Sequence, residues 1–186
     1  GGLIFPNLPE AIFLPLILGS IAILASIIST FFVRLGKDQN IISALYKGLV
    51  GAGILSAIGF LPVILQASKN LKMSPPSLYL PALIGLLIVA GMFSITEFFT
   101  SKKYSPVRSI ARASQSGHGT NIIAGLAVGM KSTILPVILI SAGILISFSS
   151  GGLYGLALSA LAMISLSGLI IALDSYGPIT DNAAGI

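Results

Sequence analysis

The sequence contains no cysteine, only one histidine and few charged residues. Asp, Glu, Lys and Arg together make up 8% of its 186 residues, while hydrophobic residues make up 55%. A soluble domain carries about 25% charged residues, because its surface has to face water. The composition therefore excludes an ordinary soluble domain and predicts a protein that meets lipid over most of its surface. The missing cysteines also exclude disulfides and thiolate metal sites.

Local motifs of several enzyme classes are absent as well. The sequence has no P-loop, no G-x-S-x-G and no H-E-x-x-H pattern. Its net charge of +5 does not indicate nucleic-acid binding, because the Lys and Arg residues lie at the ends of apolar runs, as the positive-inside rule describes. The beginning, GGLIFPNLPEA, has neither an initiator Met nor the basic start of a signal peptide, so we expect an internal part of a longer protein.

Long charge-free windows predict an all-α, polytopic transmembrane helix bundle. Windows such as 11–33 and 73–96 reach the roughly 20 residues that a helix needs to cross about 30 Å of hydrocarbon. The window 132–173 is too long for one crossing and contains the turn signal SFSSGGLYG. We therefore predict a single membrane segment, 1–186, with five helices and two cytoplasmic loops. The helices are expected at about 11–35, 41–68, 74–100, 121–148 and 152–180, and the loops at about 34–41 and 100–120.

Basic residues set the expected orientation of these helices. Seven Lys and Arg residues lie in or beside the loops at 34–41 and 100–120, whereas two, Lys69 and Lys72, lie on the opposite side. By the positive-inside rule both loops face the cytoplasm. The last helix then runs inward, and its end, DSYGPITDN, lies at the cytoplasmic side. Five crossings leave the two termini on opposite sides of the membrane.

Two carboxylates near the end of the sequence are the leading candidates for function. Asp174 and Asp181 are seven residues apart, which on an unbroken helix places them on one face about 10 Å apart. Pro178 lacks an N–H, so the Asp174 carbonyl loses its partner and becomes available as a ligand, while Gly177 lets the helix open. A carboxylate inside the bilayer is costly unless it is hydrated, paired or metal-bound, and oxygen donors without cysteine favour Mg²⁺ over Zn²⁺. The alternative is that both residues lie in the headgroup region.

Other polar residues each leave two interpretations open. Lys131 lies about ten residues into the fourth helix, where it either reaches the cytoplasmic interface or faces an anionic group inside the bundle. Glu97 has the same two interpretations at the end of the third helix. Arg108 and Arg112 lie one turn apart if their loop is helical, and either attract a phosphate or mark the inner face. His118, between two glycines, is expected to be an ordinary loop residue.

Glycines recur at the spacing that lets membrane helices pack closely. Gly125 and Gly129 form one GxxxG pair, and Gly151 and Gly155 form another. Small residues at this spacing let helix backbones approach each other in lipid, although glycine is also frequent in membrane helices generally. Either pair is therefore a candidate contact between helices.

The end of the sequence, ALDSYGPITDNAAGI, resembles the D-x-Y-G-P-[IV]-x-D-N-A-[GA]-G-I signature of the membrane-bound, ion-translocating pyrophosphatases. The stretches ITEFFTSKKYSPVRSIARASQSGHGTNIIAGLAVGMKSTILPV and FFVRLGKDQNIISALYKG are similar to the same family. The resemblance extends from about residue 25 to residue 186. One mild departure is Ala184, where many members have glycine.

This resemblance implies a proton- or sodium-pumping inorganic pyrophosphatase, built as a homodimer of sixteen-helix subunits in the bacterial inner membrane. The substrate would be Mg²⁺-pyrophosphate, hydrolysed at a cytoplasmic site, with K⁺ dependence undecided. Carried over to this sequence, Asp181 would coordinate the active-site Mg²⁺, Asn182 would accompany it, and Asp174 would support the site. Most pyrophosphate ligands and the water-activating residues would lie outside this sequence, so we expect the segment alone to be inactive. The rival hypothesis is a secondary transporter or channel segment in which the two aspartates relay an ion.

Overall fold

The computed structural model of the chain describes residues 4–5, 8–34 and 41–185. Every regular element in these ranges is helical, which confirms the predicted all-α class. The first half contains α1 (Glu10–Ser29), the short 3₁₀ helix η1 (Thr30–Phe32), α2 (Ile41–Leu71) and α3 (Pro75–Thr100). The second half contains α4 (Ser105–Ala113), the 3₁₀ helix η2 (Ser114–Ser116), α5 (His118–Ser132), α6 (Ile134–Ser165), α7 (Ser167–Asp174) and α8 (Tyr176–Ala184).

Four helical stretches are long and apolar enough to cross a membrane: Glu10–Phe32, Ser43–Leu71, Pro75–Ser116 and His118–Ala183. The fourth has 66 residues, which is about 99 Å of helix at 1.5 Å per residue and far exceeds one crossing. The prediction of five helices counts this stretch as two. The chain is an integral membrane protein with several spans.

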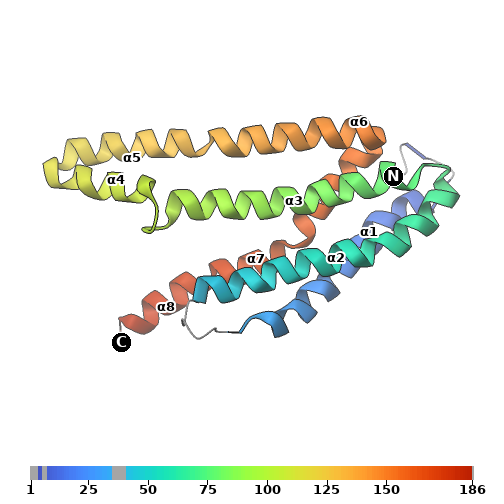
Figure 1. The fold of residues 1–186 in the computed structure, drawn as a ribbon, viewed down its shortest axis with the longest axis horizontal. Coiled ribbons are helices and arrows are strands. Elements are labelled where there is room, and N and C mark those ends of the chain that lie inside the picture. Colours follow the sequence, from blue (N-terminus) through green and yellow to red (C-terminus); the bar gives the residue numbers. More distant parts are fainter. Residues whose placement is uncertain (1–3, 6–7, 35–40, 186) are drawn as a thin grey trace.

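The longest stretch folds back on itself at Gly152. The backbone there has φ 59° and ψ −153°, a conformation outside the helical region that glycine adopts without a steric penalty. Before this point α6 packs its Gly143 against Ile88 of α3, and after it Ser159 packs against Gly85 of the same helix. Figure 1 shows the chain turning back where α6 meets the beginning of α3. The hairpin predicted around SFSSGGLYG is therefore located at Gly152.

The two predicted GxxxG pairs have different surroundings. Gly151 and Gly155 pack against the beginning of α3, where an added Cβ would collide with the Ser77 carbonyl and press on the Pro81 ring. An added Cβ at Gly125 or Gly129 would meet no atom within 4 Å. Only the pair at Gly151 and Gly155 therefore forms a close helix contact within the described part of the chain.

A hydrogen bond from α6 replaces the backbone hydrogen bond that a proline removes from α1. Pro15 has no N–H, so the carbonyl of Ala11 has no partner in its own helix. The buried Tyr154 of α6 donates its hydroxyl to this oxygen at 2.9 Å. Its ring also packs edge-on against Phe5, with 5.2 Å between the centroids. The contact fixes the start of α1 beside the α6 hairpin, within a core formed by α1, α2, α3, the second arm of α6 and α7.

The two ends of the bundle are formed by different elements. In Figure 1 the beginning of α1 and the α6 hairpin lie at one end, whereas α4 and α8 lie at the other. The predicted loop at 34–41 lies mostly outside the described residues. The predicted loop at 100–120 is largely helical, because it contains α4, η2 and the first turn of α5. Arg108 and Arg112 are accordingly one turn apart on a helix.

Candidate functional site

A cavity of about 750 Å³ opens at the α4 end of the bundle, between α2, α3, α6 and the α7–α8 junction. Its apolar lining is Leu45, Val89, Met92, Phe93, Ile140, Met163, Ile170 and Leu173. Its polar lining is Thr96, Glu97, Thr100, Ser101, Lys102, Asp174 and Tyr176. The last turn of α3 and the end of α7 supply this polar part, so Glu97 and Asp174, predicted separately, belong to one cavity.

Glu97 is held in place from the neighbouring helix. Its side chain is half-buried, and the hydroxyl of Tyr46 on α2 donates a hydrogen bond to its Oε2. The Tyr46 ring packs edge-on against Phe93 of α3, with 4.9 Å between centroids and 79° between planes. Tyr46 is not among the residues that the sequence predicts for the site. Its only signal in the sequence is a hydroxyl-bearing ring at the same end of the bundle as Glu97.

Asp174 lies at a break in the last helix. α7 ends at Asp174 and α8 begins at Tyr176, and Ser175 between them donates its backbone N–H to the Ile171 carbonyl at 3.0 Å. Pro178 cannot donate to the Asp174 carbonyl, so this oxygen is free of its usual helical partner, as predicted. The backbone at Ser175 stays close to helical, with φ −66° and ψ −19°, so the break interrupts hydrogen bonding more than direction.

Asp181 and Asn182 lie one helix further on and are exposed. Neither lines the cavity that contains Glu97 and Asp174. Among the described elements α8 contacts only α7. Within the described ranges no three His, Asp or Glu side chains are grouped closely enough to hold a metal ion. The structure therefore brings Asp174 and Glu97 to one cavity, and leaves Asp181 on an uncovered helix.

The remaining candidates are exposed and stand apart from the cavity. Lys131 lies in the last turn of α5, just before the helix is interrupted at Thr133. Gly177 and Pro178 are exposed on α8, where they shape the backbone and contribute no side-chain donor. His118 is the exposed first residue of α5.

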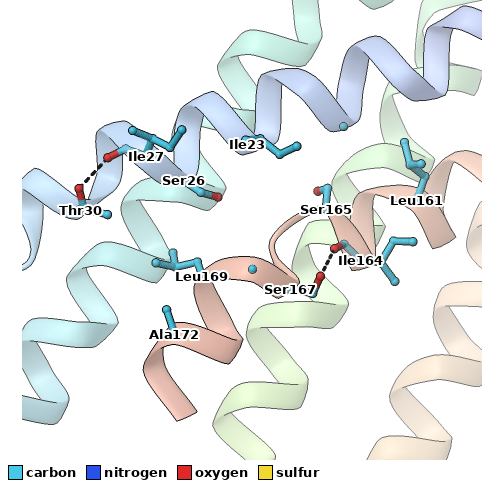
Figure 2. Close-up of a pocket in the computed structure, with 12 residues that line it drawn as sticks. Ile23, Ser26, Ile27, Thr30, Leu161, Ile164, Ser165, Ser167, Leu169 and Ala172 are labelled. Carbon is cyan, nitrogen blue, oxygen red and sulfur yellow. Dashed lines mark hydrogen bonds between the residues drawn. The ribbon is translucent and has the colours of Figure 1, made fainter. Parts of the chain in front are cut away.

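A second groove, of about 520 Å³, lies between α1 and the α6–α7 junction. Figure 2 shows two of its hydroxyls bonded to backbone carbonyls three residues earlier: Thr30 Oγ1 donates to the Ile27 carbonyl at 2.7 Å, and Ser167 Oγ donates to the Ile164 carbonyl at 2.6 Å. Its lining contains no charged residue. This groove suits an apolar helix surface. The cavity lined by Glu97, Lys102 and Asp174, which we call the charged cavity, is therefore the better candidate for chemistry.

Comparison with known proteins identifies the family. The profile of the family described as inorganic H⁺ pyrophosphatase matches residues 3–186. The chain belongs to this family. The K⁺-insensitive pyrophosphate-energized proton pump of Methanosarcina mazei is 44% identical over the whole of this chain, which spans 28% of that relative. The pyrophosphate-energized proton pump 2 of Rhizobium leguminosarum bv. trifolii is 43% identical over 97% of this chain and 88% of the relative.

The name of a further relative mentions a different pumped ion. The putative K⁺-stimulated pyrophosphate-energized sodium pump of Clostridium tetani is 41% identical over the whole chain, which spans 28% of it. Identity to proton pumps and to this sodium pump differs by only a few per cent. Overall identity within the family therefore does not discriminate between H⁺ and Na⁺ for this chain.

Proposed function

We propose that this chain is part of a membrane pump that hydrolyses Mg²⁺-pyrophosphate and couples the hydrolysis to H⁺ or Na⁺ translocation. The observation that carries the proposal is family membership over residues 3–186, which includes the whole D-S-Y-G-P-I-T-D-N segment. The names of the relatives favour a pyrophosphate-driven pump over a secondary transporter or channel. We also propose a homodimer in the bacterial inner membrane, with the α4 and α8 end of the bundle facing the cytoplasm.

The donor set at this end of the bundle fits Mg²⁺. Proteins usually hold Mg²⁺ through one or two carboxylates together with substrate phosphates and water, so a dedicated cage of acids is not required. Asp181 is exposed on α8 and supplies one such carboxylate, with Asn182 beside it as a neutral oxygen and amide donor. The ion, when bound, neutralises part of the pyrophosphate charge and draws electron density from the bond that breaks.

The residues of this chain have separate tasks in the proposal. Asp181 binds the metal, which in turn holds the substrate. Asp174, on the other side of the Pro178 break, supports the site from the charged cavity, where it shares space with the Tyr46-bound Glu97. The Asp174 carbonyl, which lacks its helical partner because of Pro178, adds a partial negative charge that favours a cation. Further pyrophosphate ligands and the water-activating groups are expected from other parts of the full-length protein.

The full-length protein in sealed membrane vesicles tests the proposal. It should hydrolyse pyrophosphate only when Mg²⁺ is present, and hydrolysis should drive H⁺ or Na⁺ into the vesicles. A protonophore that abolishes uptake of the ion without slowing hydrolysis would assign H⁺, whereas its failure to do so in a Na⁺ medium would assign Na⁺. A correctly folded protein without any Mg²⁺-dependent pyrophosphatase activity contradicts the proposal.

A further inference from the structure

A compact group of aromatic and basic side chains surrounds the turn between α3 and α4. Its rings are Phe98, Phe99 and Tyr104, and its cations are Lys102, Lys103 and Arg108. We call this group the α3–α4 basic surface. It lies immediately after the charge-free window 73–96, so its side chains lie at the level where α3 leaves the hydrocarbon.

The rings and cations of this surface are ordered by contacts with one another. The Phe98 and Tyr104 rings lie 5.3 Å apart, and the Nζ of Lys103 lies 5.6 Å from the centre of the Tyr104 ring. Arg108 Nε donates to the backbone carbonyl of Lys102 at 3.2 Å. This bond uses one of the five guanidinium N–H groups and leaves the terminal nitrogens of the exposed side chain available for an anion.

The helix that follows presents its charges on one side. On α4, Arg108 and Arg112 are exposed, while Val107 and Ile110 are half-buried on the face that the helix turns toward its neighbours. α4 contacts α3, η2 and α5. The basic side of α4 therefore continues the α3–α4 basic surface away from the bundle.

The protein supplies no anion to this surface from the surrounding segment. From Phe98 to Leu173 the sequence contains no Asp or Glu. The nearest acid along the chain, Glu97, accepts its hydrogen bond from Tyr46 on α2. The sequence of α4, α5 and α6 offers no acidic partner to Lys103 and Arg108, whereas Lys102 lines one cavity with Glu97 and Asp174. The exposed Lys103 and Arg108 are therefore available to an external anion.

We infer that the α3–α4 basic surface binds the headgroups of anionic lipids. Aromatic rings at the membrane interface and basic side chains just beyond it are the combination that holds such lipids, because the rings pack against the acyl boundary and the cations meet the phosphate. Arg108 adds bidentate donors that suit a phosphodiester. The inference concerns lipid binding and is independent of the pyrophosphatase chemistry proposed above.

Native mass spectrometry of the purified full-length protein, titrated with phosphatidylglycerol in mild detergent, tests the inference. The informative variant is Lys103→Gln/Arg108→Gln, which leaves Lys102 in the charged cavity unchanged. The matched control is Lys69→Gln/Lys72→Gln, which removes the same number of charges at the opposite end of the bundle. All four side chains are exposed, so neither variant disturbs the core.

The apparent affinity for phosphatidylglycerol should fall about 25-fold in Lys103→Gln/Arg108→Gln, since each basic side chain near an anionic surface is worth about fivefold. It should change less than about twofold in the control. Arg108→Lys should lose less affinity than Arg108→Gln, because it keeps the charge but not the bidentate donors. Equal losses in the two double variants, or no loss in either, would overturn the inference. So would displacement of the lipid by inorganic phosphate at equal concentration, because the surface would then bind soluble anions.

Discussion

Replacing Tyr154 with Phe removes one hydroxyl from the core and leaves the Ala11 carbonyl without a donor. Pro15 prevents α1 from satisfying this oxygen itself, and the hydroxyl donates to it at 2.9 Å. Hydrogen bonds between membrane helices contribute about 0.6 kcal/mol on average and about 1.7 kcal/mol at most. Because a buried acceptor is left without any partner here, we expect a loss near the upper end, about 1–2 kcal/mol.

A double-mutant cycle separates this hydrogen bond from the other contacts of the ring. In a Pro15→Ala background residue 15 has an N–H that can bond to the Ala11 carbonyl, so Tyr154→Phe should cost less than about 0.5 kcal/mol. The predicted coupling between the two positions is therefore about 1 kcal/mol. Tyr79→Phe is a matched comparison, because Tyr79 donates to the Ala57 carbonyl at 3.0 Å while Leu61 retains its own N–H for the same oxygen.

The assay is reversible unfolding of this segment in mixed micelles, followed by far-UV circular dichroism as the fraction of denaturing detergent increases. Tyr154→Phe should lower the free energy of unfolding more than Tyr79→Phe does. Pro15→Ala should remove most of that difference. A loss for Tyr154→Phe that is the same in both backgrounds would refute the role assigned to the proline.

Three further outcomes follow from the fold and the cavity. Gly151→Ala should destabilise this segment by about 1–3 kcal/mol, because the added Cβ meets the backbone of Ser77. Gly125→Ala should change the free energy of unfolding by less than about 0.5 kcal/mol. Equal effects of the two substitutions in the same unfolding assay would contradict the packing described. Tyr46→Phe should lower the pyrophosphatase activity of the full-length protein, because Glu97 loses the donor that holds it in the cavity wall. The measurement is the hydrolysis rate at saturating Mg²⁺ and unchanged expression. A fully active variant would show that this bond is dispensable. The segment by itself should insert into membranes without turning over pyrophosphate, and phosphate release by the purified segment would show that its site is complete.

The membrane-crossing stretches and the hairpin could be predicted because a single sequence pattern determines each of them. Charge-free windows located the membrane-crossing stretches, because crossing hydrocarbon requires a minimum apolar length. The Gly-Gly pair inside the longest window located the hairpin, since the reversal at Gly152 has a positive φ. The sequence pattern predicts a loop where the nine-residue α4 lies, because so short a helix depends on packing against α3 and α5 for its stability.

The candidate site was only partly predictable for a related reason. The proline break beside Asp174 is a local property of the chain and was expected from Pro178 alone. The bond between Tyr46 and Glu97 joins residues 51 positions apart and depends on how α2 and α3 pack. The two GxxxG pairs have the same sequence pattern, and only the presence of Pro81 and Ser77 opposite Gly151 distinguishes them.

The Mg²⁺ dependence of pyrophosphate hydrolysis in Asp181→Asn and Asp174→Asn tests the central claim most directly. Asn keeps the volume and a neutral oxygen but removes the charge that holds the metal, so in the full-length protein Asp181→Asn should abolish hydrolysis and pumping together or raise the Mg²⁺ requirement steeply. Asp174→Asn should retain some Mg²⁺-pyrophosphate binding, because Asp174 supports the site from the cavity. Near-native activity of Asp181→Asn at unchanged Mg²⁺, with loss of metal binding in Asp174→Asn, would contradict this assignment.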